Sequence, residues 1–285
     1  MSKLKIAVQK EGRLHDESMK ILSEIGISID NGKDQLKASA RNFPLEVFYL
    51  RNGDIPQYLR DGIVDVAILG ENLLIEKGKD LSIIERLGFS RCRVSVAVPK
   101  AEKYTSVKDL EGKQIATSYP VTTQKFLDAH GIKAKLHIIN GSVEIAPNIG
   151  LADAIVDIVS SGSTLFKNNL KEVEVVLKSE AALVVSPKIT AETDVLLKKI
   201  QFRLQSVLKA RNSKYVLLNT RNENINKIIS ILPGMKSPTI VPLAIEGWSS
   251  LHSVINKNDF WEVIDELKTH GAEGILVCPI ENMIL

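Results

Sequence analysis

Features that would assign a protein to several common classes are scarce or missing in this sequence of 285 residues. Only two cysteines occur, Cys92 and Cys278, both in apolar segments typical of strands. Two isolated thiols exclude a disulfide framework and a cysteine-ligated metal site, and they are typical of a reducing cytoplasm. No uncharged apolar run approaches the roughly 18 residues of a membrane-spanning helix, and the N-terminal apolar run is too short for a signal peptide. We therefore expect a cytoplasmic protein with no membrane partner.

Charge of one sign is not in excess either. The chain has 37 basic and 34 acidic residues, a formal net charge of +3, and no long basic run. This balance gives no electrostatic reason to expect a nucleic-acid partner, although a local group of basic side chains can still bind a small polyanion. The motifs GxxxxGKS/T, GxGxxG, HExxH and paired CxxC are absent, so the usual signals for P-loop nucleotide binding, hydride transfer and zinc sites are missing.

Hydrophobic periodicity indicates an α/β protein. Short β-branched segments alternate with helical patterns through the first 185 residues, and the helices end near a glycine. The predicted strands are 4–9, 46–50, 64–70, 93–99, 114–118, 135–141, 154–159 and 182–187, and the predicted helices are 16–26, 55–62 and 123–131. Such alternation favours mostly parallel sheets that are covered by helices on both faces.

One internal similarity indicates two related lobes. The segment DGIVDVAILGENLL, which begins at Asp61, aligns without gaps to DAIVDIVSSGSTLF, which begins at Asp153, at a constant offset of 92. The same register pairs Asp65 with Asp157. Because ligands of open α/β sheets bind at the carboxyl ends of strands, we expect a binding cleft between the two lobes. The alternative is a chance similarity between two buried strands.

The pattern changes in the last 70 or so residues, which suffice for a separate small domain. Strands are predicted at 214–220, 237–244, 248–255 and 272–280, and helices at 222–232 and 258–271. The order β-α-β-β-α-β is that of the split ferredoxin-like unit. One long amphipathic helix, 190–213, is expected to lead into this unit.

The segment DAIVDIVSSGSTL, residues 153–165, carries the strongest chemical signal. A buried strand with two carboxylates, Asp153 and Asp157, runs into a turn of small residues. These are Ser160, Ser161, Gly162, Ser163 and Thr164. Hydroxyls and free N–H groups at the start of a helix form a cradle for a phosphate monoester, and carboxylates on one side of a strand are acceptors for sugar hydroxyls. The alternatives are an ordinary strand-to-helix turn and, for the carboxylates, a salt bridge to a neighbouring lobe.

Basic side chains at two other predicted strand ends are candidates for binding phosphate groups. Lys10 and Arg13 flank Gly12 directly after the first strand, and Arg51 follows the second. Guanidinium groups bind phosphate oxygens through two parallel hydrogen bonds, so several such side chains in a cleft suit a polyphosphate. For each residue the alternative is a solvated surface position.

Two acidic residues are further candidates. Glu71 lies in the polar turn GEN at the end of a predicted strand. Glu144 precedes the serine-rich turn, and either it helps to bind a metal ion or substrate, or it begins a helix favourably at the positive end.

These motifs together resemble the ATP phosphoribosyltransferase family in its long form. The resemblance runs through IAVQKEGRL, RNGDIPQYLRDGIVDVAILGEN, RCRVSVAVP, GKQIATSYP, INGSVEIAPNIGLADAIVDIVSSGSTL, PTIVPLA and ILVCPIE, and so covers essentially the whole chain. It implies a two-lobed, periplasmic-binding-protein-like catalytic core with the active site between the lobes, plus a C-terminal ferredoxin-like regulatory domain. The expected limits are 1–90 with 182–212 for catalytic lobe I, 91–181 for lobe II and 213–285 for the regulatory domain.

The resemblance also implies a reaction. The enzyme would condense ATP with 5-phosphoribosyl 1-pyrophosphate (PRPP), joining N1 of adenine to C1 of ribose and releasing pyrophosphate, in the first step of L-histidine biosynthesis. Asp153 and Asp157 would be the catalytic residues, binding or orienting the ribose hydroxyls, and the turn from Ser160 to Thr164 would hold the 5-phosphate. Lys10, Gly12, Arg13, Arg51 and Glu71 would face ATP or pyrophosphate, and Mg²⁺, with Glu144 as a ligand, would neutralise the leaving group.

Regulation is the third implication of the resemblance. The C-terminal domain would bind L-histidine as a feedback inhibitor, with Met235, Thr239 and Gly274 lining its pocket. The chain would assemble as a homo-oligomer, a dimer or hexamer, and the inhibitor would act by binding one quaternary state better than another.

Two rival functions use the same lobes. A two-lobed solute-binding protein would close around a ligand without catalysis, but the missing signal peptide, the phosphate-type turn and the third domain argue against it. The effector module of a transcription factor would need a helix-turn-helix or a basic patch, and neither precedes the lobes. Turnover of PRPP separates the enzyme from both.

Overall fold

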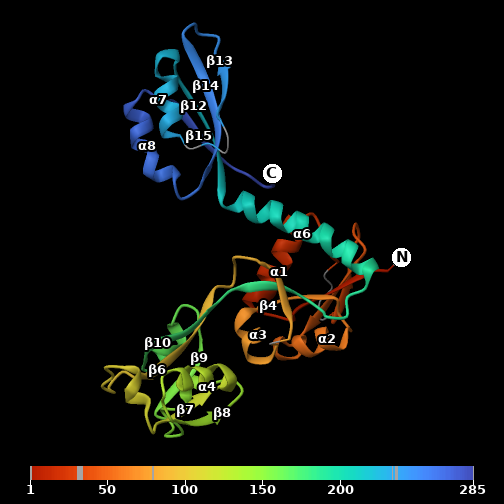
Figure 1. The fold of residues 1–285 in the computed structure, drawn as a ribbon, viewed down its shortest axis with the longest axis vertical. Helices are drawn as coiled ribbons and strands as arrows, with labels where there is room; N and C mark the ends of the chain where they lie inside the picture. The colour runs from red at the N-terminus through yellow and green to blue at the C-terminus, as the bar shows by residue number, and fades with distance from the viewer. Residues whose placement is uncertain (1, 31–34, 79, 233, 235–236, 285) are drawn as a thin grey trace. The chain divides into compact units, whose positions relative to one another are not determined.

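The computed structural model describes residues 2–30, 35–78, 80–232, 234 and 237–284. They form two compact units, residues 1–197 and 198–285. Three sheets are drawn from red to blue in Figure 1, two in the first unit and one in the second. The α/β fold class predicted from the sequence is confirmed. No helix among the described residues is long and apolar enough to cross a membrane.

The first sheet, with its helices, makes up the first lobe. Its strands are β1 (Leu4–Gln9), β2 (Lys37–Ser39), β3 (Leu45–Leu50), β4 (Val66–Gly70), β5 (Ser82–Arg86) and β11 (Ala181–Val185). They lie in the order β2-β3-β1-β4-β11-β5. Strand β1 pairs in parallel with β3 and β4, whereas β11 runs antiparallel to β4 and β5. Strand β11 is antiparallel to its neighbours because it enters this sheet from the second sheet and not through a helical crossover.

The second sheet, with its helices, makes up the second lobe. Its strands are β6 (Cys92–Pro99), β7 (Gln114–Thr117), β8 (Lys135–Ile138), β9 (Ala154–Val159) and β10 (Leu170–Ser179). They lie in the order β10-β6-β9-β7-β8. Strand β7 pairs in parallel with β8 and β9, and the incoming strand β6 is antiparallel to β9 and β10. Apart from the incoming strand of each lobe and the short edge strand β2, the strands of each sheet run in one direction. Among the described residues, however, only four of the nine strand pairs in these two sheets are parallel, so the prediction of mostly parallel sheets holds in part.

The two lobes repeat one topology. In each sheet the incoming strand lies between the last parallel strand and the strand that leaves for the other lobe. The chain therefore crosses between the lobes twice, from β5 to β6 and from β10 to β11. Two α/β lobes joined by two such crossings form the periplasmic-binding-protein-like core that was expected.

The structure corrects the register of the internal repeat. At the start of β4, the Asp65 carboxylate accepts the Lys5 N–H at 2.8 Å, and the Asp65 N–H donates to the Lys5 carbonyl at 2.9 Å. At the start of β9, Asp153 makes the same two bonds to Gln114, both at 2.8 Å. Asp153 is thus equivalent to Asp65, not to Asp61, and the alignment at an offset of 92 was wrong by one four-residue step. The sequence misled because each of the two aligned segments has two aspartates four residues apart.

In the corrected register, the position of Asp157 on β9 corresponds to Leu69 on β4. Leu69 is fully buried among apolar side chains of the first lobe. The repeat therefore explains the aspartate at the start of each strand as a structural device, because it pins two parallel strands together. It gives no structural reason for the second aspartate, Asp157, which must be accounted for in another way.

Helices cover the sheets of the first unit. They are α1 (Arg13–Glu24), α2 (Ile55–Asp61), α3 (Glu71–Lys77), α4 (Pro120–Ala129) and α5 (Ser163–Lys167), with α6 (Ala191–Arg211) continuing into the second unit. In the second lobe, β9 contributes to two cores, because its side chains alternate between the faces of the sheet. Val156 packs with Leu127 of α4 on one face, and Ile155 packs with Leu165 of α5 on the other.

The second unit has the predicted β-α-β-β-α-β order. Its elements are β12 (Ser213–Arg221), α7 (Ile225–Ile231), β13 (Thr239–Pro242), β14 (Trp248–Asn256), α8 (Phe260–Thr269) and β15 (Glu273–Pro279). The antiparallel sheet has the order β13-β14-β12-β15, as in a ferredoxin-like fold. Ile228 of α7 and Leu267 of α8 pack on Leu218 and Leu251 of the sheet, so the helices cover one face, as Figure 1 shows.

Three strands of the core were not predicted, the three-residue edge strand β2 and the longer strands β5 and β10. Strand β10 reads LKEVEVVLKS, and its charged residues and two irregularities of register hide the alternation of a strand. Strand β5, SIIER, is short and lies at the edge of the first sheet, without a fully buried face. Strands β5 and β10 are the strands that leave a lobe, and their pairing depends on a partner that comes from elsewhere in the chain.

The corrected register predicts which aspartates support the fold. Asp65→Ala and Asp153→Ala each remove an acceptor of a backbone N–H and should each lower the free energy of unfolding by about 1–2 kcal/mol. Asp61→Ala is the matched control, because Asp61 only accepts a bond from Gln57 on the exposed face of α2. Its effect should be a few tenths of a kcal/mol, roughly that of one exposed pair on a helix. Urea denaturation measures all three, and an Asp61→Ala effect equal to that of Asp153→Ala would restore the original register.

Candidate functional site

A loop of small polar residues, 160–164, follows β9 at its carboxyl end and is called the serine loop below. Ser160 and Ser161 lead to Gly162, whose φ of +78° lies in the left-handed region, and α5 begins at the next residue. Glycine adopts this conformation without strain, so the turn depends on it. The Ser161 hydroxyl donates to Ser163 Oγ at 3.0 Å, and the space beside the glycine is open within 4 Å. The loop offers hydroxyls and N–H groups around an unfilled space, together with Thr164 in the first turn of the helix.

Asp157 is the buried carboxylate next to this loop. It is 9% exposed, and its Oδ1 accepts a hydrogen bond from the Ser118 hydroxyl at 3.0 Å. Burial raises the pKa of Asp157, while hydrogen bonds from the Ile158 backbone and from Ser118 act in the opposite direction. A carboxylate that is costly to bury, at a position where the other lobe has leucine, indicates a function.

Glu144 lies on the same side of the second sheet as Asp157. It belongs to a short 3-10 turn, Val143–Ile145, and its charge adds to the rise in the pKa of Asp157. Among the described residues no group of three or more His, Cys, Asp or Glu side chains is placed to hold a metal ion. Two carboxylates fit Mg²⁺ only when substrate and water oxygens complete the octahedron, which is the usual arrangement for this ion.

The structure separates Asp153 from the loop. Asp153 lies at the start of β9 and the loop at its end, roughly 20 Å apart at the rise of a strand. Its carboxylate is engaged with the Gln114 N–H at 2.8 Å. Of the two aspartates predicted as catalytic, only Asp157 is therefore next to the predicted phosphate cradle.

The predicted basic residues gather at the carboxyl ends of the first sheet. The Lys10 N–H donates to the Leu50 carbonyl at 2.8 Å, which places Lys10 beside Arg51 at the ends of adjacent strands. Gly12 has a φ of +90° and directly precedes α1, whose first residue is Arg13. The side chains of all three basic residues are exposed, so the edge of this lobe carries a group of unburied positive charges.

Arg13 connects the basic group to the loop of the other lobe. Its Nη1 donates to the Ser160 hydroxyl at 2.6 Å. Arg93 supports the same loop from β6, because its Nη1 donates to the Ser160 carbonyl at 3.2 Å while the rest of its guanidinium pairs with Glu172. Charged donors from both lobes thus converge on the start of the predicted phosphate cradle.

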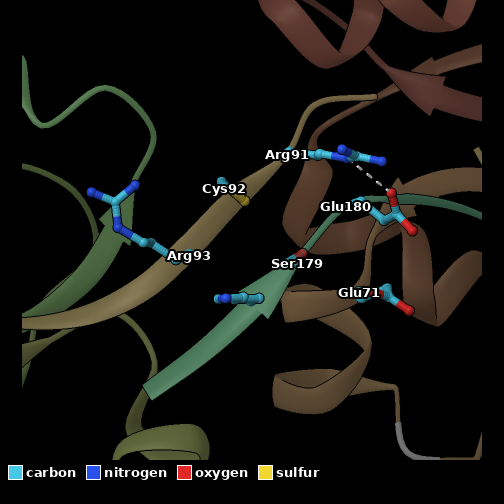
Figure 2. Close-up of a pocket in the computed structure, with 7 residues that line it drawn as sticks. Glu71, Arg91, Cys92, Arg93, Ser179 and Glu180 are labelled. Atoms are coloured by element: carbon cyan, nitrogen blue, oxygen red, sulfur yellow. Dashed lines mark hydrogen bonds and ion pairs between the residues drawn. The ribbon is translucent and has the colours of Figure 1, made fainter. Parts of the chain in front are cut away.

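A cavity of about 500 Å³ lies where the chain crosses between the lobes (Figure 2). It is lined by Glu71, Arg91, Cys92, Arg93, Lys178, Ser179 and Glu180. Figure 2 shows Arg91 reaching towards Glu180, with 3.5 Å between Nε and Oε2, whereas Arg93 points away from them. Glu71 accepts a hydrogen bond from Arg86 Nε at 2.7 Å. Glu71 therefore lies at the crossing between the lobes.

Comparison with protein families identifies the family to which the chain belongs. The family described as ATP phosphoribosyltransferase matches residues 51–206, and the one described as HisG, C-terminal domain, matches residues 210–282. This chain belongs to the ATP phosphoribosyltransferase family. The match includes the serine loop, Asp157 and the crossing segments.

Individual relatives support the family over the full length. An ATP phosphoribosyltransferase of Parabacteroides distasonis is 54% identical over 99% of this chain and 100% of its own length. One of Cytophaga hutchinsonii is 52% identical over 99% of this chain and 98% of its own. Among solved structures, an ATP phosphoribosyl transferase (HisG:HisZ) complex from Thermotoga maritima is 30% identical, with a TM-score of 0.60, over 71% of this chain and 98% of that one. The ATP phosphoribosyltransferase fold is thus shared beyond close relatives.

The sequence did not single out several polar residues of this ATP phosphoribosyltransferase core. Asn72 donates from Nδ2 to the Tyr119 hydroxyl at 2.9 Å and accepts from the Ser179 hydroxyl at 2.9 Å. Burial, with the nearby charge of Asp157, raises the pKa of Tyr119 to about 12. The polar turns GEN and ATSYP contain Asn72 and Tyr119, but only the tertiary structure shows that they meet.

The residues expected to bind an inhibitor are spread over the second unit. Thr239 begins β13 and Gly274 lies in β15, which are the two opposite edge strands of the sheet. Met235 is outside the described residues. Gly274 has a φ of +57°, and a Cβ there would lie 3.2 Å from the Asn219 side-chain nitrogen. Within the described part of one copy, the structure does not bring Thr239 and Gly274 together.

The buried state of Asp157 predicts a stability change with pH. Burial raises the pKa of Asp157 in the folded chain above its value in the unfolded chain. The protonated carboxyl therefore favours folding at a pH below the pKa of the unfolded chain, and this contribution is lost as the pH rises through the pKa of the folded chain. Above that range Asp157→Asn, which buries no charge, should be more stable than wild type by on the order of 1 kcal/mol. Thermal unfolding of both proteins between pH 3 and pH 8 measures the difference, which should vanish at the acidic end. A variant less stable at pH 8 would contradict this assignment.

Proposed function

We propose that this protein catalyses the condensation of ATP with PRPP to phosphoribosyl-ATP and pyrophosphate, the first step of L-histidine biosynthesis. The lone pair of adenine N1 forms the new bond to ribose C1, and the C1–O bond breaks with its electron pair leaving on pyrophosphate. The observation that carries the proposal is the buried Asp157 directly before a serine and glycine loop, in a chain of the ATP phosphoribosyltransferase family. A phosphate cradle beside a hydroxyl acceptor is what a phosphorylated ribose requires.

The loop is proposed to bind the 5-phosphate of PRPP. Ser161, Ser163 and Thr164 supply hydroxyls, and Gly162 allows the phosphate to approach the backbone, because it carries no side chain and has open space beside it. Ser160 is engaged by Arg13 in the free protein. The guanidinium of Arg13 is therefore already placed at the rim of the phosphate site.

Asp157 is proposed to accept hydrogen bonds from the ribose hydroxyls. A carboxylate that is poorly solvated in the free protein gains more from a new hydrogen-bond donor than an exposed one does. Asp153 is not given this role in the proposal, because its carboxylate binds the Gln114 N–H at the far end of β9. We propose that it acts on the substrate only through the position of the strand.

The exposed cations of the first lobe are proposed to bind the other anionic groups. Lys10, Arg13 and Arg51 would face the phosphates of ATP or the pyrophosphate, and Gly12 would let the start of α1 approach them. Glu71 is proposed as a neighbour of ATP at the crossing between the lobes, where it lines the cavity.

The family uses a metal ion, and we propose Mg²⁺. Glu144 and Asp157 would hold it together with oxygens of the substrate, and the ion would supply positive charge for the departing pyrophosphate. No strong general base is required, because the attacking ring nitrogen carries no proton. Positioning and electrostatic stabilisation by the residues above are sufficient sources of catalysis.

Domain roles follow from the same proposal. Residues 1–90 and 182–212 would form catalytic lobe I, residues 91–181 lobe II, and residues 213–285 a regulatory domain that binds L-histidine. The chain would work in the cytoplasm as a homo-oligomer, either a dimer or a hexamer. The family match of a distinct C-terminal domain supports this division.

The activity itself is tested with purified protein, ATP, PRPP, Mg²⁺ and a pyrophosphatase, with phosphoribosyl-ATP detected by mass spectrometry. Wild type should form product, and Asp157→Asn should lower kcat by on the order of 100-fold because a transition-state contact is lost. Asp61→Ala, on an exposed helix face, should retain full activity. Absence of product from folded wild-type protein would favour a two-lobed solute-binding protein, and near-normal turnover of Asp157→Asn would remove that residue from the site.

Regulation is tested separately. L-histidine should suppress product formation, and Gly274→Ala should weaken the suppression while activity without histidine stays unchanged. Gly247→Ala is the matched control, because Gly247 also has a positive φ, +81°, but has nothing within 4 Å of its Cβ position. Full inhibition of Gly274→Ala would remove this residue from the inhibitor site, and a wild-type enzyme insensitive to histidine would contradict the regulatory role of residues 213–285.

A further inference from the structure

The two lobes of the core meet at a buried carboxylate. Glu76, near the end of α3 in the first lobe, is 8% exposed. Its oxygens accept hydrogen bonds from three groups of the second lobe, the Val121 N–H at 2.8 Å, the Thr122 N–H at 2.9 Å and the Thr122 hydroxyl at 2.8 Å. All three donors belong to the first turn of α4.

Helix α4 obtains its N-terminal cap from the other lobe. The residue at its own cap position, Tyr119, makes no capping bond through its side chain. The first N–H groups of a helix have no partner within it and carry a partial positive charge. The carboxylate of Glu76 satisfies two of these groups, so the helix of one lobe is completed by a side chain of the other.

Asn72 extends the same junction. It lies four residues before Glu76, on the same face of α3, since side chains four apart on a helix are neighbours. Its side-chain Nδ2 donates to the Tyr119 hydroxyl in the second lobe. Its backbone N–H donates to the Ser179 hydroxyl at the crossing to β11, and its side-chain Oδ1 accepts from the same hydroxyl. One face of α3 thus holds both the start of α4 and one of the two crossings.

The junction is continuous with the candidate site. The residue before Tyr119 is Ser118, whose hydroxyl donates to Asp157 at 3.0 Å. The Tyr119 N–H in turn donates to the Thr117 hydroxyl at 2.9 Å. The short segment that orients Asp157 is therefore fixed on one side by β7 and on the other by a helix of the first lobe.

We propose that Glu76 is a positioning residue that clamps the two lobes at a fixed angle and thereby holds Ser118 and Asp157 in place for the ribose. Opening of the lobes at this side would leave a buried carboxylate and two helix N–H groups without partners, which is costly. The core is accordingly a locked frame and not a pair of lobes that swings open and shut. Only the catalytic consequence rests on the proposed function; the clamp does not.

The chain offers a control for the hydrogen bonds of Glu76 in Asp109. Its carboxylate accepts the Thr105 N–H at 2.6 Å, the Ser106 N–H at 3.0 Å and the Thr105 hydroxyl at 2.8 Å. This is the same set of donors as for Glu76, two amides and one threonine hydroxyl, but all of it lies within the second lobe. Asp109 is exposed whereas Glu76 is buried, so Asp109→Ala controls for the loss of these hydrogen bonds without touching the contact between the lobes.

The clamp is tested by measuring the distance between the lobes in the full chain. Spin labels are placed at Lys20→Cys on α1 and Lys135→Cys on β8, both exposed, in a Cys92→Ser, Cys278→Ser background diluted with unlabelled chain. Wild type and Asp109→Ala should give the same narrow distance distribution by pulsed electron resonance. Glu76→Ala should give a broader or longer one, and a distribution unchanged from wild type would overturn the proposal.

The positioning role is tested by kinetics on the same variants. Glu76→Ala should raise the KM for PRPP about tenfold and lower kcat, whereas Asp109→Ala should stay close to wild type in both parameters. Glu76→Gln keeps one acceptor oxygen and should recover part of both parameters. If Glu76→Ala and Asp109→Ala have the same kinetics, Glu76 is only a structural cap. If wild type has no activity, the distance measurement still tests whether Glu76 holds the two lobes together.

Discussion

The site depends on the direction in which parallel strands run. Strands that are joined by helical crossovers end at the same edge of their sheet, and the loops after them are therefore neighbours. Lys10 and Arg51 follow β1 and β3 at one such edge, and Ser118 and Ser160 follow β7 and β9 at the other. Because each lobe gathers its polar residues in this way, a short contact such as that of Arg13 with Ser160 is enough to bring the two groups together.

The carboxylates buried between the lobes cost free energy to desolvate, and they differ in how many hydrogen-bond donors the fold supplies to them. Glu76 has its donors supplied by the other lobe. Asp157 has one side-chain donor and remains in an environment that raises its pKa. A fully satisfied carboxylate serves to hold elements together, whereas an incompletely satisfied one keeps capacity for a ligand. This difference separates Glu76 from Asp157, the carboxylate that faces the proposed ribose site.

Much of the fold could be predicted from the sequence, and the failures have identifiable causes. The strands that connect through helices, the long helix 191–211 and the ferredoxin-like order of the last unit follow from local periodicity. Strands β5 and β10 were missed because they leave one lobe for the other and pair with strands distant in the chain. The register of the internal repeat was set four residues off because the aspartates recur at that spacing, and only the bonds to Lys5 and Gln114 identify the equivalent pair.

For the site, the sequence by itself determined which kinds of functional residue are present. It supplied a serine and glycine loop after a strand, a pair of aspartates, basic residues after the first two predicted strands, and a resemblance that the family match confirms. The tertiary structure decided which of these residues work together, placing Asp157 beside the loop and Asp153 at the far end of the same strand. It also introduced Asn72, Glu76 and Tyr119, which no local pattern distinguishes. The physical reason is that burial and hydrogen-bond partners belong to pairs of segments far apart in the chain, and a local pattern contains only one member of each pair.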